Sequence, residues 1–263
     1  MNSRLRNLAT LYHYRDLLFT WTYRIIRARY QQSVLGGLWA IIVPAASTVV
    51  FNIIFTFFVP INTGEIPYMV FSYTAMIPWT LFSSSISDMV GSLVGNMNLV
   101  SKIYFPREIL PISTLLARLV DMVISFSLLV VLMFYFRVPV NAVYLLYLPL
   151  LILIQCSLAL GIGLIGGALN VFYRDVQHVF ILGLQLWFYA SPIIYPTTSV
   201  PSSLRAIYYL NPMAGVIDAY RAILLNQQPP DSNIFVASLV ALVILALGYW
   251  FFKRVEFQFA DVI

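Results

Sequence analysis

The sequence predicts an all-α integral membrane protein, and three observations support that fold class. First, 61% of the residues are hydrophobic and only 10% are charged, whereas a soluble domain carries about 25% charged residues. Second, long stretches contain no charge, for example between Arg29 and Glu65 and between Arg137 and Arg174. Each exceeds the ~20 apolar residues that cross a ~30 Å hydrocarbon core. Third, the apolar runs are continuous rather than alternating, which favours helices over barrel strands.

The first expected element is an amphipathic helix over residues 12–32. Two sets of side chains recur there at helical spacing, an apolar set of Tyr14, Leu18, Trp21, Ile25 and Ala28 and a polar set of Asp16, Thr20, Arg24, Arg27 and Gln31. This pattern is typical of a helix in the headgroup plane. An ordinary positively charged anchor is the alternative. Because arginines interrupt every apolar run before residue 33, we do not expect a cleaved signal peptide.

Six membrane-spanning helices are expected after this segment. Their predicted ranges are 34–59, 67–90, 109–136, 141–169, 177–195 and 233–252. No repeat, low-complexity tract or soluble linker interrupts them. The chain is therefore predicted to be one membrane domain, 1–263, with a six-span bundle at 34–252 and a short tail at 253–263.

The distribution of basic residues predicts the orientation. An even number of spans places both termini on one side, together with eleven basic residues: Arg4, Arg6, Arg15, Arg24, Arg27, Arg29, Lys102, Arg107, Arg174, Lys253 and Arg254. Arg137, Arg205 and Arg221 are left for the opposite side. Basic residues accumulate in cytoplasmic loops, so cytoplasmic termini and a cytoplasmic 102–108 segment are expected.

Residues 196–232 form the longest predicted non-spanning segment, and they are not simply hydrophilic. Within it, Asn211 and Pro212 have the residue types of an N-cap and a first helical position. The segment is longer than a minimal loop but too short for two crossings. A pair of short helices that enter the outer leaflet and return is therefore expected.

Catalytic and nucleotide-binding motifs are absent from the sequence. Lys102 and Lys253 are the only lysines and neither follows a glycine, so a phosphate-binding loop cannot form. Two histidines and the lone Cys156 form no metal-binding spacing, and the acidic residues are not paired as a general acid and base. We expect no enzymatic activity, bound cofactor, metal or nucleic acid. Any ATP and magnesium would belong to another subunit.

Two charged residues are expected within the third span. Arg118 and Asp121 are three residues apart and can pair on one helix face. Charge at that depth is costly and marks a functional candidate. The alternative is a structural pin between helices, or an arginine that extends its head to the interface.

Aromatic residues and glycines also recur in the predicted spans. Candidates for a translocation pathway are Phe51, Phe55, Phe58, Trp187, Tyr189 and Tyr195, because aromatic rings stack on the apolar faces of sugars. An interfacial aromatic belt is the alternative. Gly163 and Gly167 form a small-xxx-small step that predicts close helix packing.

Five stretches resemble one family, the permeases of polysaccharide-exporting ABC transporters, in the branch for O-antigen, capsule and teichoic acid. They are RARYQQSVLGGLWAIIVP (27–44), NMNLVSKIYFPREILPIS (96–113), ALNVFYRDVQHV (168–179), WFYASPIIYP (187–196) and NPMAGVIDAYRAILL (211–225). The resemblance implies a homodimer driven by two cytoplasmic ATP-binding subunits. It also implies that the outer helix pair closes the exit, bordered by Tyr189 and Tyr195.

The resemblance also implies which residues contact the ATP-binding subunits. These are Arg24, Arg27, Lys102, Tyr104, Phe105, Pro106, Arg107, Glu108, Tyr173, Arg174 and Asp175. Replacement of Phe105 and Arg107 by alanine is expected to uncouple ATP hydrolysis from export without loss of insertion. The predicted function is an inner-membrane permease for a lipid-linked polysaccharide. A permease for a small drug or lipid, and an integral-membrane transferase acting on lipid-linked sugar, are the alternatives.

Overall fold

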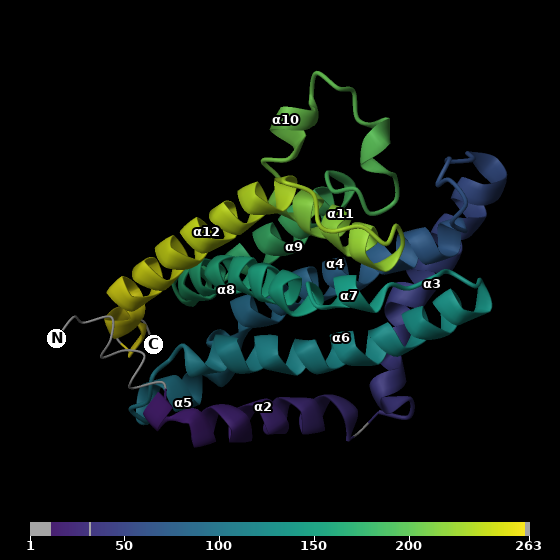
Figure 1. Ribbon diagram of the computed structural model, residues 1–263. Coiled ribbons are helices and arrows are strands. Elements are labelled where there is room, and N and C mark those ends of the chain that lie inside the picture. Colours follow the sequence, from purple (N-terminus) through teal and green to yellow (C-terminus); the bar gives the residue numbers. More distant parts are fainter. Residues whose placement is uncertain (1–11, 32, 261–263) are drawn as a thin grey trace.

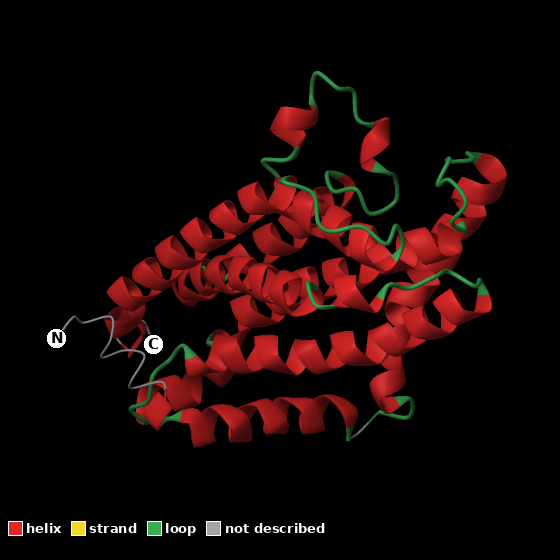
Figure 2. Cartoon of the chain, viewed as in Figure 1, coloured by secondary structure: helices red, strands yellow, loops and turns green. Residues whose placement is uncertain are grey.

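The computed structural model describes residues 12–31 and 33–260, in which all regular structure is helical and no strand occurs (Figures 1 and 2). Arg4 and Arg6, used in the charge count, lie outside the described residues. The elements are α2 (Arg15–Tyr30), η1 (Gly36–Leu38), α3 (Trp39–Ile53), η2 (Ile54–Phe58), α4 (Tyr68–Ser92), η3 (Val94–Asn96), α5 (Met97–Lys102), α6 (Ile109–Tyr135), α7 (Ala142–Leu145), α8 (Leu148–Phe172), α9 (Val176–Tyr189), η4 (Thr197–Ser199), α10 (Arg205–Tyr208), α11 (Pro212–Leu224), α12 (Asn233–Val255) and η5 (Glu256–Ala260).

Four of the six predicted spans are helices long and apolar enough to cross a membrane. They are Gly36–Phe58, Ile109–Tyr135, Ala142–Phe172 and Asn233–Phe259. The predicted spans 67–90 and 177–195 also form helices, α4 and α9, but neither belongs to this set. α4 has the length, but serine, threonine, tyrosine and aspartate make it more polar. α9 has 14 residues and is about 21 Å long at 1.5 Å per residue, shorter than the ~30 Å core.

Helix α4 forms the centre of the bundle. It contacts α3, α6, α8, α9 and α11, and Tyr73, Phe82 and Met89 on it are fully buried. Its polar side chains are accommodated by hydrogen bonds, such as that from the Thr74 hydroxyl to the carbonyl of Val70 at 2.8 Å. Protein rather than lipid therefore surrounds most of α4, which explains why its sequence is less apolar than that of the other long helices.

Glycines allow α8 to approach two neighbouring helices closely. A Cβ on Gly163 would come within 2.7 Å of the Met89 sulfur, and a Cβ on Gly167 would come within 3.0 Å of the Met89 carbonyl oxygen. The close packing predicted for these two glycines is thus confirmed, with α4 as the partner. A second close contact, between Gly161 on α8 and Gly248 on α12, was not predicted from the sequence. A Cβ on Gly248 would overlap the carbonyl oxygen of Gly161.

We expect Gly248→Ala to destabilise the protein by about 1–3 kcal/mol, the usual cost of overpacking. The obstructing atoms belong to the backbone of Gly161, so they cannot rotate away. Thermal unfolding of the detergent-solubilised protein measures the change. Gly183→Ala on α9 is the matched control, because nothing lies within 4 Å of its Cβ position. The control should be neutral or stabilising by up to about 1 kcal/mol; equal effects of both variants would disprove the contact.

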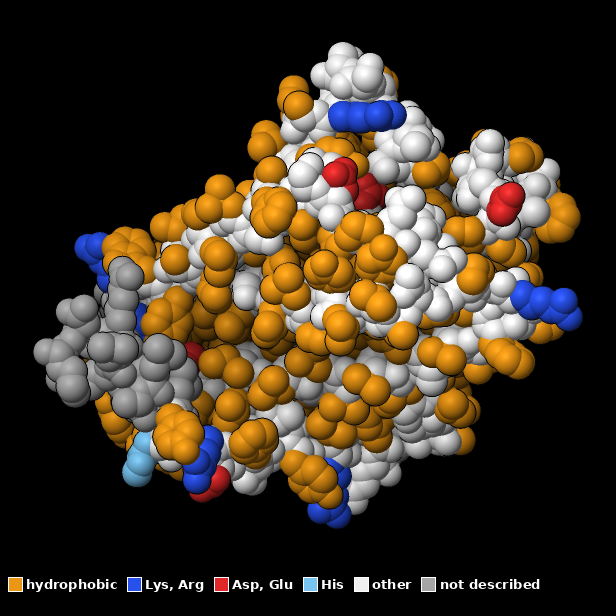
Figure 3. Space-filling view, in the orientation of Figure 1, with side chains coloured by type: hydrophobic (Ala, Val, Ile, Leu, Met, Phe, Trp, Pro, Cys, Tyr) orange, Lys and Arg blue, Asp and Glu red, His pale blue; other side chains and the backbone are white. Residues whose placement is uncertain are grey.

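The bundle has two distinct ends. At one, called the α5 end, the starts of α2 and α6 meet α5, the end of α8 and the end of α12 (Figure 1). At the other, called the α10 end, the loop carrying α10 projects from the bundle. Between them the visible surface is largely hydrophobic, with charged side chains toward its edges (Figure 3). This distribution fits a multi-pass membrane protein.

Candidate functional site

The 102–108 segment lies at the α5 end, and its residues point in two directions. Lys102 and Tyr104 are exposed, and Tyr104 is 92% exposed. Phe105 is buried at 6% exposure, in a cluster that includes Trp21 of α2. Pro106 is half-buried. Phe105 therefore packs inside this chain, and Tyr104 is the aromatic residue of the predicted coupling segment that lies outside.

The charged residues of this segment are used inside the protein. Glu108 is 1% exposed, and its carboxylate lies 2.7 Å from the Lys253 Nζ of α12. Arg107 donates a hydrogen bond to the backbone carbonyl of Glu256 and lies 5.8 Å from the centre of the Phe259 ring. Since Arg107 and Glu108 tie the start of α6 to the end of α12, alanine at Arg107 would disturb this junction as well as any partner contact.

The other two predicted coupling regions approach the same end. Tyr173, Arg174 and Asp175 are exposed in the turn between α8 and α9. The preceding Phe172 packs on Phe259, with 5.9 Å between ring centres. Phe259 therefore contacts both the 102–108 segment and the α8–α9 junction, so the two predicted coupling turns lie beside the same C-terminal segment.

Helix α2 lies along α6 and runs in the same direction (Figure 1). Its predicted apolar face is buried against protein at Trp21. Arg24 is exposed and lies 4.5 Å from the centre of the Trp21 ring. Arg27 is also exposed, and its Nε donates to Gln31 at 3.0 Å. Both predicted contact arginines are thus on the outward side of α2.

An ionic cluster joins α2, α4 and α6 through Arg29, Asp88, Arg118 and Asp121. Asp121 accepts from Arg29 at 2.6 Å and from Arg118 at 3.0 Å. Asp88 accepts from Arg29 at 2.9 Å and from Arg118 at 2.7 Å. The side chains are 12–28% exposed, so screening by water is limited. The predicted Arg118–Asp121 ion pair is present, and it is one of four ion pairs among the four residues of the cluster.

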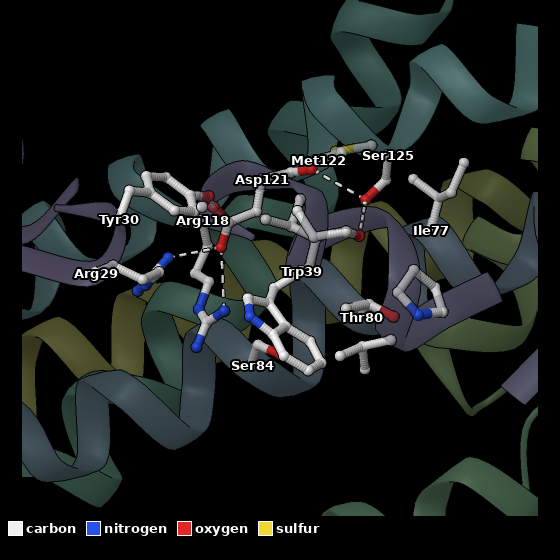
Figure 4. Close-up of a pocket in the computed structure, with 15 residues that line it drawn as sticks. Arg29, Tyr30, Trp39, Ile77, Thr80, Ser84, Arg118, Asp121, Met122 and Ser125 are labelled. Carbon is white, nitrogen blue, oxygen red and sulfur yellow. Dashed lines mark hydrogen bonds and ion pairs between the residues drawn. The ribbon is translucent and has the colours of Figure 1, made fainter. Parts of the chain in front are cut away.

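Tyr30 completes this cluster by donating a hydrogen bond to Asp121. Burial, and then the hydrogen bond to Asp121, raises the pKa of Tyr30 to about 12, so the phenol keeps its proton. A cavity of about 230 Å³ lies beside these groups, between α2, α3, α4 and α6 (Figure 4). Because each arginine has two carboxylate partners, the geometry supports the structural-pin interpretation of Arg118.

The sequence did not predict Arg29, Tyr30 and Asp88 as members of this cluster. Arg29 was counted among the basic residues on the side of the termini, and Asp88 is one of the acidic residues that are not paired as a general acid and base. A usable signal was present, since the third span carries both an arginine and an aspartate. A carboxylate and a guanidinium that pair within one helix still have hydrogen-bond acceptors and donors left for charged partners on neighbouring helices.

The predicted pathway aromatics divide into packed and exposed groups. Phe51 stacks on Phe188 with ring centres 5.8 Å apart, and Phe55 packs on Tyr68 at 5.6 Å. Trp187 meets Phe82 edge-on at 5.2 Å. These three predicted rings therefore contribute to internal packing within a single chain.

The remaining predicted pathway residues are Phe58, Tyr189 and Tyr195. Phe58 is 75% exposed and Tyr189 is 57% exposed. The Tyr195 hydroxyl bonds the carbonyl of Tyr189 and the hydroxyl of Tyr208, both at 3.1 Å. The structure does not bring all six predicted residues to one surface. Tyr189 and Tyr195 do lie together, at the end of α9.

Asn211 organises the start of α11. Its side chain accepts from the Met213 backbone nitrogen at 3.0 Å, which confirms the predicted N-cap. The same oxygen accepts from the Trp187 Nε1 at 2.8 Å. Its amide nitrogen donates to Ala190 and Ser191. One side chain therefore caps α11 and holds the end of α9.

We expect Asn211→Ala to cost about 2–3 kcal/mol, because loss of a cap costs about 1 kcal/mol and the partly buried indole loses its acceptor. Asn141→Ala is the matched control. Asn141 also caps a helix, through the Val143 nitrogen at 3.1 Å, but α7 has only four residues. The control should cost about 1 kcal/mol or less. Thermal unfolding compares the two, and an equal loss would contradict the additional role of Asn211.

Arg221 was assigned from sequence to the basic residues of the outer side, but it is buried at 5% exposure. Its Nη atoms donate to the carbonyls of Pro192 at 2.6 Å and Ile193 at 2.8 Å. Its guanidinium stacks on Phe71, 3.5 Å from the ring centre. Arg221 thus holds α11 against the turn after α9 and the start of α4, a role that charge counting could not reveal.

Comparison with known proteins gives consistent matches over most of the chain. A family model described as ABC-2 type transporter matches residues 16–225. An O-antigen export system permease protein RfbA of Myxococcus xanthus is 32% identical over 263 residues, covering 98% of this chain and 100% of that protein. An RfbA of Klebsiella pneumoniae is 27% identical, covering 94% and 95%. The polysialic acid transport protein KpsM of Escherichia coli is 27% identical, covering 89% and 91%.

Proposed function

The chain belongs to the ABC-2 type transporter family, and from this premise we propose that it is the membrane permease of an ATP-driven polysaccharide exporter. The observation that carries the proposal is the full-length similarity to an O-antigen export permease. The substrate is a lipid-linked polysaccharide that moves outward across the inner membrane. The chain itself performs no covalent chemistry.

The ATP-binding subunits are separate chains in this proposal. Lys102 and Lys253 are the only lysines and neither follows a glycine, so this chain supplies no phosphate-binding loop. Two ATP-binding subunits would bind at the α5 end. Support comes from the exposed Tyr104, from the exposed turn Tyr173–Asp175, and from Arg24 and Arg27 on the outward side of α2.

We further propose six spans with cytoplasmic termini in one membrane domain. α4 and α9 would complete the set, with α4 shielded from lipid by protein. The α11 helix and the segment before it form the re-entrant element. Eleven of the thirteen α11 residues are buried, as a non-spanning helix at membrane depth requires. The start of α2 and the end of α12 share the α5 end, which fits an even number of spans.

A second copy of the chain is part of the proposed transporter. α3 and α9 bury few residues, Pro44 and Thr48 on α3 and Leu184 on α9. Their apolar faces are available to lipid and to a partner copy. A pathway between two copies would place Tyr189 and Tyr195 near its exit.

The test is deletion of the gene in its native host, followed by complementation. Loss of surface polysaccharide, with polymer accumulating inside and an ATP-binding subunit co-purifying with the tagged chain, is the expected result. Normal surface polysaccharide in the deletion strain would overturn the proposal. Altered drug resistance alone would favour a small-molecule permease. Sugar transfer by the purified chain without ATP would favour a transferase.

A further inference from the structure

A cavity of about 500 Å³ with both polar and apolar lining residues lies at the α10 end. Four parts of the chain form its walls: the loop Asn62–Ile66, Phe71 near the start of α4, the segment Pro196–Thr198 with Tyr209, and the outward side of α11 with the residues that follow it. Its volume is within the range of about 300–1,000 Å³ typical of small-ligand sites. It is separate from the cavity beside the ionic cluster, which lies among α2, α3, α4 and α6.

Asp218 of α11 is the central polar group of this cavity. The Tyr209 hydroxyl donates to its carboxylate at 2.7 Å, and the Thr197 hydroxyl donates at 3.3 Å. The pKa of Asp218 is raised, chiefly by burial, although the Tyr209 hydrogen bond, the nearby Arg221 and the Thr197 hydrogen bond act to lower it. Burial, then the hydrogen bond to Asp218, raises the pKa of Tyr209 to about 12. Tyr209 therefore keeps its proton and remains a donor.

Asp218 retains unused capacity to accept hydrogen bonds. A carboxylate offers about four lone-pair sites, and the hydrogen bonds recorded for Asp218 are those from Tyr209 and Thr197. Within the described residues it forms no ion pair. Arg221 lines the same cavity, but its three nitrogens donate to the carbonyls of Phe71, Pro192 and Ile193. The arginine is committed to holding the backbone, and the carboxylate is left for a hydroxyl donor.

The rest of the lining fits an uncharged sugar. Thr198 and Asn226 are exposed lining residues with polar side chains. The amide oxygen of Asn62 accepts from Gly64 at 2.9 Å, which leaves its NH₂ group available as a donor. The half-buried side chain of Ile66 adds apolar surface, which suits the C–H face of a pyranose, while Phe71 and Leu225 form the buried apolar base of the cavity.

Charge argues against an anionic ligand. Two carboxylates, Asp218 and Asp231, line the cavity with one buried arginine. A phosphate or a uronate would enter a site of net negative charge, which is unfavourable at low effective dielectric. The carboxylate of Asp231 already accepts hydrogen bonds from the Ser232 backbone nitrogen and the Asn233 side-chain amide. Asp218 is therefore the carboxylate assigned to accept from a ligand.

We propose that this cavity binds an uncharged sugar unit of the exported polysaccharide, with Asp218 accepting from sugar hydroxyls and Tyr209 positioning the carboxylate. This inference rests on the proposed function for the source of the sugar. It adds a specific carbohydrate subsite at the α10 end, distinct from the aromatic residues predicted to line a pathway.

The test measures protection of an introduced cysteine. Cys156, the single natural cysteine, is replaced by serine, and Thr198→Cys places a thiol at the cavity. Ser203→Cys is the matched control, since Ser203 is also exposed but does not line the cavity. The full chain in lipid nanodiscs is labelled with a charged maleimide while neutral disaccharides are titrated. At twice the Kd, occupancy should slow labelling about threefold at Thr198→Cys and leave Ser203→Cys unchanged.

Asp218→Asn keeps the side-chain shape and should abolish the protection, and thermal unfolding checks that this variant remains folded. No protection by any neutral disaccharide, or equal protection in Asp218→Asn, would overturn the inference. Protection by calcium chloride alone would identify a cation site, and protection by inorganic phosphate alone an anion site. Either result would also overturn it.

A second arm separates this inference from the proposed function. The same variants are labelled on cells that synthesise the surface polysaccharide and on cells that do not. Slower labelling of Thr198→Cys only in the producing cells is expected, since the exported chain would occupy the cavity. Export without any protection would reject the subsite and leave the permease function intact. Protection by disaccharides with normal surface polysaccharide after gene deletion would reject the function instead.

Discussion

Replacing Tyr104 by alanine should reduce polysaccharide export about 5- to 150-fold, the range that a coupling free energy of about 1–3 kcal/mol produces. Tyr104 is 92% exposed at the α5 end, so its ring is available to an ATP-binding subunit. Because it makes little internal contact, its removal should change the unfolding free energy by no more than about 0.5 kcal/mol. Surface polysaccharide, ATPase activity of the purified complex and thermal unfolding are measured together.

Two other variants make this prediction specific. Phe105→Ala, at the neighbouring buried position, should cost about 3 kcal/mol or more of stability, since it removes a ring from the apolar cluster around Trp21. Tyr135→Ala replaces a tyrosine that is 76% exposed at the far end of α6 and should leave export unchanged. Wild-type export in Tyr104→Ala would exclude Tyr104 from the coupling contact.

Arg118→Ala should destabilise the protein by about 2–3 kcal/mol, somewhat less than the cost of about 3–5 kcal/mol for breaking a fully buried ion pair, because the cluster is partly exposed. The variant leaves Asp88 and Asp121 with Arg29 as their common cation. Repulsion between these carboxylates, one on α4 and the other on α6, should loosen the contact between those two helices. We therefore expect a lower unfolding temperature, measured by thermal unfolding of the detergent-solubilised protein.

Arg15→Ala provides the comparison for charge alone. Arg15 pairs with Asp16 at 3.8 Å, and the two side chains are 53% and 92% exposed. Exposed pairs contribute between 0 and about 1 kcal/mol, so this variant should unfold like the wild type. If Arg118→Ala also unfolded like the wild type, Arg118 would have no part in holding α4 against α6.

Much of the helical architecture was predictable because apolar length is a direct consequence of the membrane environment. The stretch between Arg137 and Arg174 has no charge and forms α7 and α8 as a single apolar unit. The N-cap at Asn211 was predictable from residue type, since its side chain bonds within its own turn. The close approach at Gly163 was also predictable, but its partner Met89 was not.

Side-chain direction in the candidate sites was the part that could not be predicted. Tyr104 and Phe105 are adjacent and both aromatic, yet one is exposed and the other is buried against α2. No local pattern distinguishes them, because the burial of Phe105 depends on Trp21, more than 80 residues earlier. For the same reason, charge counting placed Arg221 among the basic residues of the outer side, whereas in the structure its guanidinium donates to the carbonyls of Pro192 and Ile193.

The sequence by itself determined the membrane-helix class, the amphipathic segment ahead of the first span and the absence of a nucleotide-binding loop, because these follow from composition, periodicity and motif spacing. Only the tertiary structure decided that Arg29 and Asp88 join Arg118 and Asp121, that Tyr104 is the exposed aromatic residue of the 102–108 segment, and that Asp218 lines a cavity at the α10 end. The physical reason is that ion pairs and burial depend on which helices become neighbours. The local sequence pattern shows which faces of a helix are polar or apolar, but it does not show which residues of other helices pack against those faces.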